Sequence, residues 1–144
     1  MNIKQAAEQS GVSARNIRYY EQAGLLTPAR NPENEYRIYS QADVRALKLI
    51  RMLRTLDMPV EDIRAVLSGT LPLTEAAERQ RRQLEAEQQK LAAALSFCGE
   101  IQETELTDLN VDLYLQKMEA EEKQGNKFAD ILDDYKKVVE SESI

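Results

Sequence analysis

Residues 11–40 of this 144-residue chain contain the signals that decide its fold, and they read GVSARNIRYYEQAGLLTPARNPENEYRIYS. Ser13 is a residue type that caps helix N-termini, and Gly24, followed shortly by Pro28, is typical of a helix end. We therefore predict a short helix over residues 13–22.

A short β-ribbon with a polar tip is predicted next, over residues 27–39. This segment begins with turn-forming proline and asparagine residues and ends in an alternation of Tyr36 and Ile38 with Arg37 and Tyr39. Because successive strand side chains point to opposite faces, we expect Arg37 and Tyr39 to point away from whatever Ile38 packs on.

Helical signals lie on both sides of these two elements. A brief apolar face precedes them and ends at Gly11. After them, Ser40 opens the capping box Ser-Gln-Ala-Asp, and Pro59 restarts a helix that Gly69 ends. Helix, helix, ribbon, helix, helix is the layout of a winged helix-turn-helix domain, which we place at residues 1–70.

A longer helix is predicted over residues 74–104, where strong helix formers run without glycine or proline as far as Phe97. Its apolar residues form one narrow heptad stripe, and such a helix is not stable without a partner. The stripe comprises Ala77, Leu84, Leu91, Leu95, Cys98 and Ile101. A second copy of the chain is the expected partner, since twofold dimers dominate among soluble oligomers. Packing on residues 106–139 of the same chain is the alternative.

Residues 105–144 are predicted to form a short helical tail. Apolar residues from Leu106 onward indicate one helix that ends near Lys123, and Gly125 marks a turn. A final helix is predicted from a stripe at helical spacing, Phe128, Ile131, Leu132 and Tyr135. The whole chain is therefore expected to be mostly α-helical.

The outward face of the predicted helix at residues 13–22 has the chemistry of a DNA-reading surface. Ile17 and Tyr20 can pack inward, which leaves two arginines and a tyrosine on the other face. Arginine forks match guanine edges, and tyrosine can reach a phosphate or a thymine methyl group. The candidate contacts are Ser13, Arg15, Asn16, Arg18 and Tyr19. The alternative is a solvated charged face in which Arg18 pairs with Glu21.

The predicted ribbon supplies a second set of candidate DNA contacts, namely Arg30, Asn34, Tyr36, Arg37 and Tyr39. A wing that clamps phosphates needs such residues, and it fixes the position of a protein on DNA without reading sequence. Tyr36 fits a role as a core anchor equally well.

The composition excludes several classes of function. The sequence has no histidine and one cysteine, which removes the usual general base, most zinc and haem sites and any paired-thiolate metal site. We therefore expect no enzyme activity, no cofactor and no metal site. No apolar run approaches the roughly 20 residues that cross a bilayer, and the first residues lack the apolar core of a signal peptide. A cytoplasmic protein without membrane contact is expected.

The net charge of −6 is distributed unevenly, because residues 1–73 carry a net +2 and residues 74–144 a net −8. Repulsion would keep the acidic second half away from a phosphate backbone. The first half is therefore the part expected to bind nucleic acid.

The order and spacing of these motifs resemble the MerR family of transcription regulators over about residues 2–69. The resemblance is carried by Gly11-Val12-Ser13, Ile17-Arg18-Tyr19-Tyr20-Glu21, Gly24-Leu25-Leu26, Pro28, Arg30, Tyr36-Arg37-Ile38-Tyr39-Ser40, Asp43, Leu47, Met58, Glu61 and Ile63. Three residues depart from the family pattern: Asn16 stands where threonine is common, and Glu35 and Asp57 stand where glycine is common.

The resemblance implies a homodimer whose long helices form an antiparallel coiled coil and whose winged domains bind double-stranded DNA at a pseudo-palindromic promoter operator. Regulators of this family bend and untwist the spacer DNA so that RNA polymerase engages both promoter elements. Smooth bending of a short site costs about 1–6 kcal/mol, which two DNA-binding heads on one coiled coil can supply. The alternative is a coiled-coil protein-interaction module that uses the winged domain as an adaptor, although an adaptor has no need of the arginine and tyrosine set.

The resemblance also implies an effector, which we expect to be a small organic molecule. Metal sensors of the family use paired cysteines after the dimerisation helix, its iron–sulfur sensor needs four cysteines, and its aldehyde sensors place a cysteine near the position of Met52. Multidrug sensors carry a larger C-terminal domain than residues 100–144. The remaining candidates for effector contact are Cys98, Tyr114, Phe128 and Tyr135. Alternatively, Cys98 is a buried structural thiol on the heptad stripe, and the aromatic residues form a small satellite core.

Overall fold

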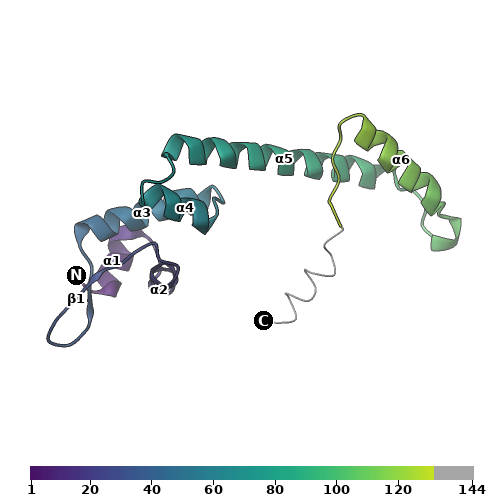
Figure 1. Cartoon of the computed structure of the whole chain (residues 1–144). Helices are drawn as coiled ribbons and strands as arrows, with labels where there is room; N and C mark the ends of the chain where they lie inside the picture. Colours follow the sequence, from purple (N-terminus) through teal and green to yellow (C-terminus); the bar gives the residue numbers. More distant parts are fainter. Residues whose placement is uncertain (132–144) are drawn as a thin grey trace. The chain divides into compact units, whose positions relative to one another are not determined.

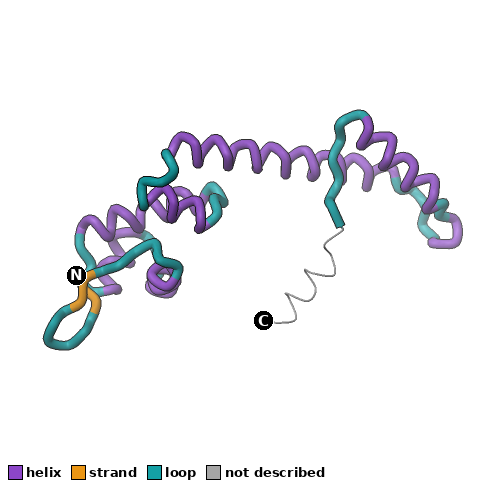
Figure 2. Tube along the Cα trace, viewed as in Figure 1, coloured by secondary structure: helices purple, strands orange, loops and turns teal. Residues whose placement is uncertain are grey.

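The computed structural model describes residues 1–131, which form helices joined by turns and one two-stranded sheet (Figures 1 and 2). The chain divides into two compact units, residues 1–81 and the part from Arg82 onward. The first unit contains α1 (Ile3–Ser10), α2 (Ala14–Gln22), β1 (Ala29–Arg30), β2 (Arg37–Ile38), α3 (Gln41–Thr55), α4 (Val60–Leu67) and the first turns of α5 (Leu73–Glu100). The order of its helices and ribbon is that of the predicted winged helix-turn-helix domain.

Local side-chain chemistry fixes where these helices begin. The Ser13 hydroxyl accepts a hydrogen bond from the Asn16 backbone N–H at 3.1 Å and caps α2. At α3, the Ser40 hydroxyl accepts from the Asp43 N–H at 3.1 Å, and the Asp43 carboxylate accepts from the Ser40 N–H at 2.9 Å. These contacts satisfy N–H groups that have no partner within the helix, which confirms the two predicted helix starts.

The predicted ribbon is confirmed, and its paired part is short. β1 and β2 run antiparallel with Ala29 opposite Ile38 and Arg30 opposite Arg37. The connecting loop closes through backbone bonds between Asn31 and Tyr36 and between Glu35 and Asn31, each 2.8 Å long. In Figure 2 the two strands lie at the base of this loop, which extends beyond the helices of the first unit as a wing.

A single apolar core holds the first unit together. In this core, α1 contacts both α2 and α3, and α3 contacts α4. The fully or almost fully buried side chains are Ala6, Val12, Ile17, Tyr20, Leu25, Leu26, Tyr39, Leu47, Ile50, Leu53, Met58, Ile63, Leu71 and Ala76. This packed core therefore holds the wing and the outward face of α2 in place.

The first turns of α5 belong to this core, a feature that the heptad pattern did not indicate. Ala76 is fully buried and Gln80 is 7% exposed. The Gln80 amide donates a 2.9 Å hydrogen bond to the carbonyl oxygen of Leu56, the residue that caps the C-terminus of α3. The helix ends at Glu100, short of the predicted residue 104, at a point where Gly99 weakens its last turn.

As far as residue 131, the second unit contains the later turns of α5, a 3₁₀ turn (Leu106–Asp108) and α6 (Val111–Lys123). The predicted helix end at Lys123 and the turn at Gly125 are confirmed. The prediction of a final helix is wrong for residues 126–131, which are not helical, and Leu132 and Tyr135 lie outside the described residues. Phe128 instead packs edge-on against Phe97 of α5, with ring centroids 5.7 Å apart, so a tertiary contact overrides the local pattern.

Among residues 1–131, no helix combines the length and the apolar character that a membrane span requires.

Candidate nucleic-acid interface

The face of α2 opposite the core carries the predicted cationic set. Ile17 is fully buried and Tyr20 is 8% exposed, and together they fix the rotation of the helix. On the outer face of α2, Arg15, Asn16, Arg18 and Tyr19 are all exposed, as is Ser13 at the cap. This rotation presents two guanidiniums and a phenol on one side of a rigid helix, which is a shape and chemistry that suit a DNA groove.

The wing presents Arg30, Tyr36 and Arg37 to solvent. Tyr36 is 74% exposed, so its side chain is no core anchor in this domain. Part of the loop chemistry is structural, because the Asn34 side-chain oxygen accepts a 3.0 Å bond from the Tyr36 N–H. The Arg30 guanidinium likewise donates to the Glu35 carbonyl at 3.3 Å. Asn34 and Arg30 therefore shape the turn that displays Tyr36.

The predicted position of Tyr39 is wrong, because its side chain is 1% exposed and lies in the core, while that of Ile38 is 42% exposed. Strand alternation fails here because β2 ends at Ile38 and the chain turns into the cap of α3. The backbone of Tyr39 pairs with Met1 through bonds of 2.8 and 2.9 Å. That pairing turns the ring of Tyr39 inward. The ring therefore lies in the core beneath the candidate interface and not on its surface.

The Glu21 carboxylate joins α2 to the wing, a contact that sequence reasoning missed. The Arg37 Nε lies 2.9 Å from one Glu21 oxygen, and the Tyr39 hydroxyl donates to the other at 3.2 Å. The Glu21 side chain is 9% exposed. The alternative pairing of Arg18 with Glu21 is not observed among the described residues. The feature of the sequence that could have pointed to this contact is the charge of Glu21, since it is the one acidic residue in the sequence of α2.

These contacts set the protonation of the buried phenol. Burial first, and then the neighbouring Glu21 carboxylate and its hydrogen bond, raise the pKa of Tyr39 from 10.0 to about 12, against a smaller lowering by Arg37 and Arg18. Tyr39 therefore keeps its proton at neutral pH and acts as the donor to Glu21.

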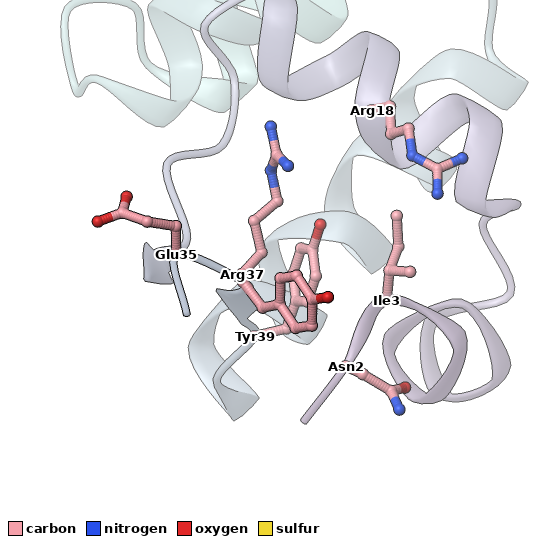
Figure 3. Close-up of a pocket in the computed structure, with 7 residues that line it drawn as sticks. Asn2, Ile3, Arg18, Glu35, Arg37 and Tyr39 are labelled. Atoms are coloured by element: carbon pink, nitrogen blue, oxygen red, sulfur yellow. The ribbon is translucent and has the colours of Figure 1, made fainter. Parts of the chain in front are cut away.

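Two hollows lie on either side of Arg37, each lined by a further arginine. The first, of about 240 Å³, is lined by Arg18, Arg37 and Tyr36 among others (Figure 3). The second, of about 260 Å³, is lined by Arg30, Arg37 and Glu21 among others. Glu35 also lines the first hollow, with its carboxylate turned away from the Arg37 guanidinium in Figure 3. Positive groups from α2 and from the wing thus converge on the same surface.

The predicted dimer-contact residues are exposed along α5. Leu84 is 40%, Leu91 65% and Leu95 75% exposed, and Ile101, just after the helix, is 48% exposed. Ala77 and Cys98 are exposed as well. Within a single chain the Cys98 thiol is therefore exposed, whereas the alternative interpretation of Cys98 made it a buried structural thiol on the heptad stripe.

The residues predicted to contact an effector are only partly brought together. In the second unit, Phe97 packs edge-on against both Tyr114 and Phe128, so these rings form a small satellite core. A cavity of about 590 Å³ beside it has a mostly apolar lining that includes Cys98, Met118 and Phe128 but not Tyr114. The Tyr114 hydroxyl donates instead to the Glu103 carboxylate at 2.7 Å. Tyr135 lies outside the described residues.

Comparison with known proteins identifies the domain. Residues 1–70 match the family model of the MerR HTH family regulatory protein. Heavy metal-dependent transcription regulator 2 of Rhizobium meliloti (strain 1021) is 47% identical over 68 residues, which are 47% of this chain and 46% of that protein. The chain therefore matches about half the length of this curated relative.

Solved structures extend the similarity beyond the winged domain. A MerR family transcriptional regulator from Listeria monocytogenes is 30% identical, with 88% of this chain and 96% of that chain covered and a TM-score of 0.52. The lead(II) complex of the regulator PbrR691 from Ralstonia metallidurans CH34 shares the fold at 20% identity, with a TM-score of 0.63 over 77% of this chain and 95% of that one. From its matched first half and its similarity to a regulator over nearly its whole length, we conclude that this chain belongs to the MerR family.

Proposed function

We propose that this chain is a homodimeric transcription regulator that binds double-stranded DNA at a pseudo-palindromic promoter operator. The observation that carries the proposal is the convergence of Arg18 on α2 with Arg30 and Arg37 on the wing around one surface. Arg15, Arg18 and Tyr19 would read base edges in a major groove, and the wing would hold the flanking phosphates.

A twofold dimer would present two such surfaces to one DNA site. The exposed leucines of α5 support this part of the proposal, because a row of large apolar side chains on one helix face is typical of a coiled-coil seam. Two recognition helices on one dimer would enter successive major grooves about 34 Å apart. Distortion of the DNA between them would then bring promoter elements into register for RNA polymerase.

The proposed effector is a small organic molecule bound in the second unit. The mostly apolar lining of the cavity beside Phe97 and Phe128 supports an organic ligand. The curated relative from Rhizobium meliloti is named as heavy metal-dependent. The sequence of this chain has one cysteine and no histidine, which favours an organic ligand over a soft metal ion.

Fluorescence anisotropy tests the proposal with the purified protein on the DNA upstream of its own gene and on a scrambled duplex. Preferential binding to the upstream DNA that weakens with salt is expected. Equal affinity for both duplexes, followed by failure to enrich any fragment from genomic DNA, would contradict sequence-specific binding and favour a protein-interaction module.

Arg18→Ala is expected to reduce the preference for the upstream DNA by about 1–3 kcal/mol, the discrimination that one bidentate base contact supplies. Lys123→Ala is the matched control, because it removes the same charge from an exposed residue of α6, outside the winged domain. If both variants kept the wild-type preference, α2 would not be the reading helix.

A further inference from the structure

Glu21 is an acidic residue placed where acid is unfavourable for the proposed function. It is the single acid in the sequence of α2, the helix whose outer face carries Arg15 and Arg18. A carboxylate near a phosphate backbone repels it and weakens binding. We therefore expect Glu21 to make contacts in the domain that offset this repulsion.

The contacts of Glu21 lead to the wing and not to the outer face of its own helix. Its carboxylate accepts from the Tyr39 hydroxyl at 3.2 Å and lies 2.9 Å from the Arg37 Nε. Tyr39 is held by the core and by the backbone of Met1. The carboxylate is thus held in place by the domain, and Arg37 is the more exposed partner of the pair.

Arg37 remains available to a ligand while it is restrained. Its side chain is 43% exposed, whereas the Glu21 side chain is 9% exposed. Arg37 lines both hollows, beside Arg18 in one and Arg30 in the other. Its closest approach to Glu21 is through Nε, and a guanidinium has five N–H donors, so its terminal nitrogens can still reach a phosphate oxygen.

We propose that Glu21 is a positioning residue for DNA binding: it holds the Arg37 guanidinium between the two hollows, where it binds a backbone phosphate together with Arg18. This inference rests on the proposed function and adds a residue that itself touches no DNA. A restrained arginine loses less side-chain entropy when it binds a phosphate than an unrestrained one.

Glu21→Gln separates positioning from simple charge, because the two effects have opposite signs. The amide oxygen of glutamine can still accept from Tyr39, but the ion pair with Arg37 is lost. Charge alone predicts tighter DNA binding after removal of a negative group. Positioning predicts binding about fivefold weaker, within the usual coupling of residues in one network.

The experiment uses a scrambled-sequence duplex at several salt concentrations, because a phosphate contact does not depend on sequence. For Glu21→Gln we expect weaker binding and a salt slope that is smaller by about one phosphate contact. Glu33→Gln is the matched control, since it removes the same charge from an exposed wing residue and should leave binding unchanged or make it tighter. Circular dichroism checks that each variant is folded.

A double-mutant cycle with Arg37→Ala supplies the decisive comparison. Glu21→Gln should have little further effect when Arg37 is already absent. Tighter or unchanged binding by Glu21→Gln, or a full additional loss in the double mutant, would overturn the inference.

A second variant keeps the inference testable if Glu21→Gln does not fold. Arg37→Lys then replaces it, because lysine keeps the charge but lacks the fork that contacts carboxylate and phosphate together. Unchanged binding by Arg37→Lys would then overturn the inference.

Two further outcomes separate this inference from the proposed function. If the wild-type protein shows no preference for upstream DNA but Glu21→Gln still has the predicted effect, only the operator function is overturned. Failure of the wild-type protein to bind any duplex at low salt would overturn both.

Discussion

Tyr39 is a buried residue with an ionisable group, and its surroundings favour the protonated form. Burial and the Glu21 carboxylate raise its pKa from 10.0 to about 12. The phenol of the unfolded chain therefore loses its proton at a lower pH than the phenol of the folded domain. Alkali accordingly favours the unfolded chain over this range.

The free energy of unfolding is therefore expected to fall as pH rises from about 10 to about 12. One group contributes a slope of about 1.4 kcal/mol per pH unit there, and its full stabilisation is present below about pH 10. Urea denaturation of the wild type and of Tyr39→Phe at several alkaline pH values measures this slope. The variant should lose that part of the pH dependence.

Tyr36→Phe is the control, because it removes the same hydroxyl group from a tyrosine whose side chain is 74% exposed. Equal slopes for the wild type and Tyr39→Phe would show that the folded domain does not retain the Tyr39 proton.

The residues that sequence reasoning placed correctly are those whose neighbours are close in the chain. Ser13 and Ser40 act through backbone N–H groups three residues away. Tyr39 was misplaced because its orientation depends on Met1, 38 residues away. The contacts of Glu21 were not predicted for the same reason, since its partners lie on the wing and not on its own helix.

Among the elements, α5 shows how one helix serves two environments. Its first turns are anchored in the winged domain by Ala76 and Gln80. Farther along, Leu84 and Leu91 are exposed. The heptad spacing predicted the exposed row, but it could not predict the anchor, because the Gln80 contact depends on the turn at Leu56, 24 residues away.

Gln80→Ala is expected to lower the free energy of unfolding of the winged domain by about 1–3 kcal/mol. The substitution removes a buried side chain and the donor to the Leu56 carbonyl, which then lacks this partner at the C-terminus of α3. Gln88→Ala, at an exposed position of the same helix, should change stability by no more than about 0.5 kcal/mol. Urea denaturation followed by circular dichroism measures both, and equal effects would mean that Gln80 is no anchor.

For the whole molecule, the uneven charge fits a protein with one DNA-facing end. Residues 1–73 carry a net +2, and residues 74–144 carry a net −8. Repulsion between the acidic half and the phosphate backbone favours orientations in which only the winged domain meets DNA. The charge distribution predicts this orientation from sequence alone, whereas the contacts of the wing could be read only from the folded domain.

The proposed dimer leads to a prediction for the molecule in solution. Leu84→Glu combined with Leu91→Glu should convert a dimer into monomers, because four carboxylates would face one another across an apolar seam. Light scattering of the purified protein measures the mass. Gln83→Glu with Gln89→Glu adds the same charges off the apolar row, and this control should remain dimeric. A dimer that survives the leucine substitutions would place the interface elsewhere.

The two departures from the family glycines have a consequence for laboratory evolution. Glu35 and Asp57 both adopt left-handed backbone angles, with φ of 63° and 62°, and glycine is the residue that adopts this conformation without strain. Every glutamate and aspartate codon becomes a glycine codon by one change of its middle base. An error-prone library of this gene therefore contains both relaxed turns among its single-nucleotide variants, and selection for DNA binding or for heat resistance can sample each of them in its first round.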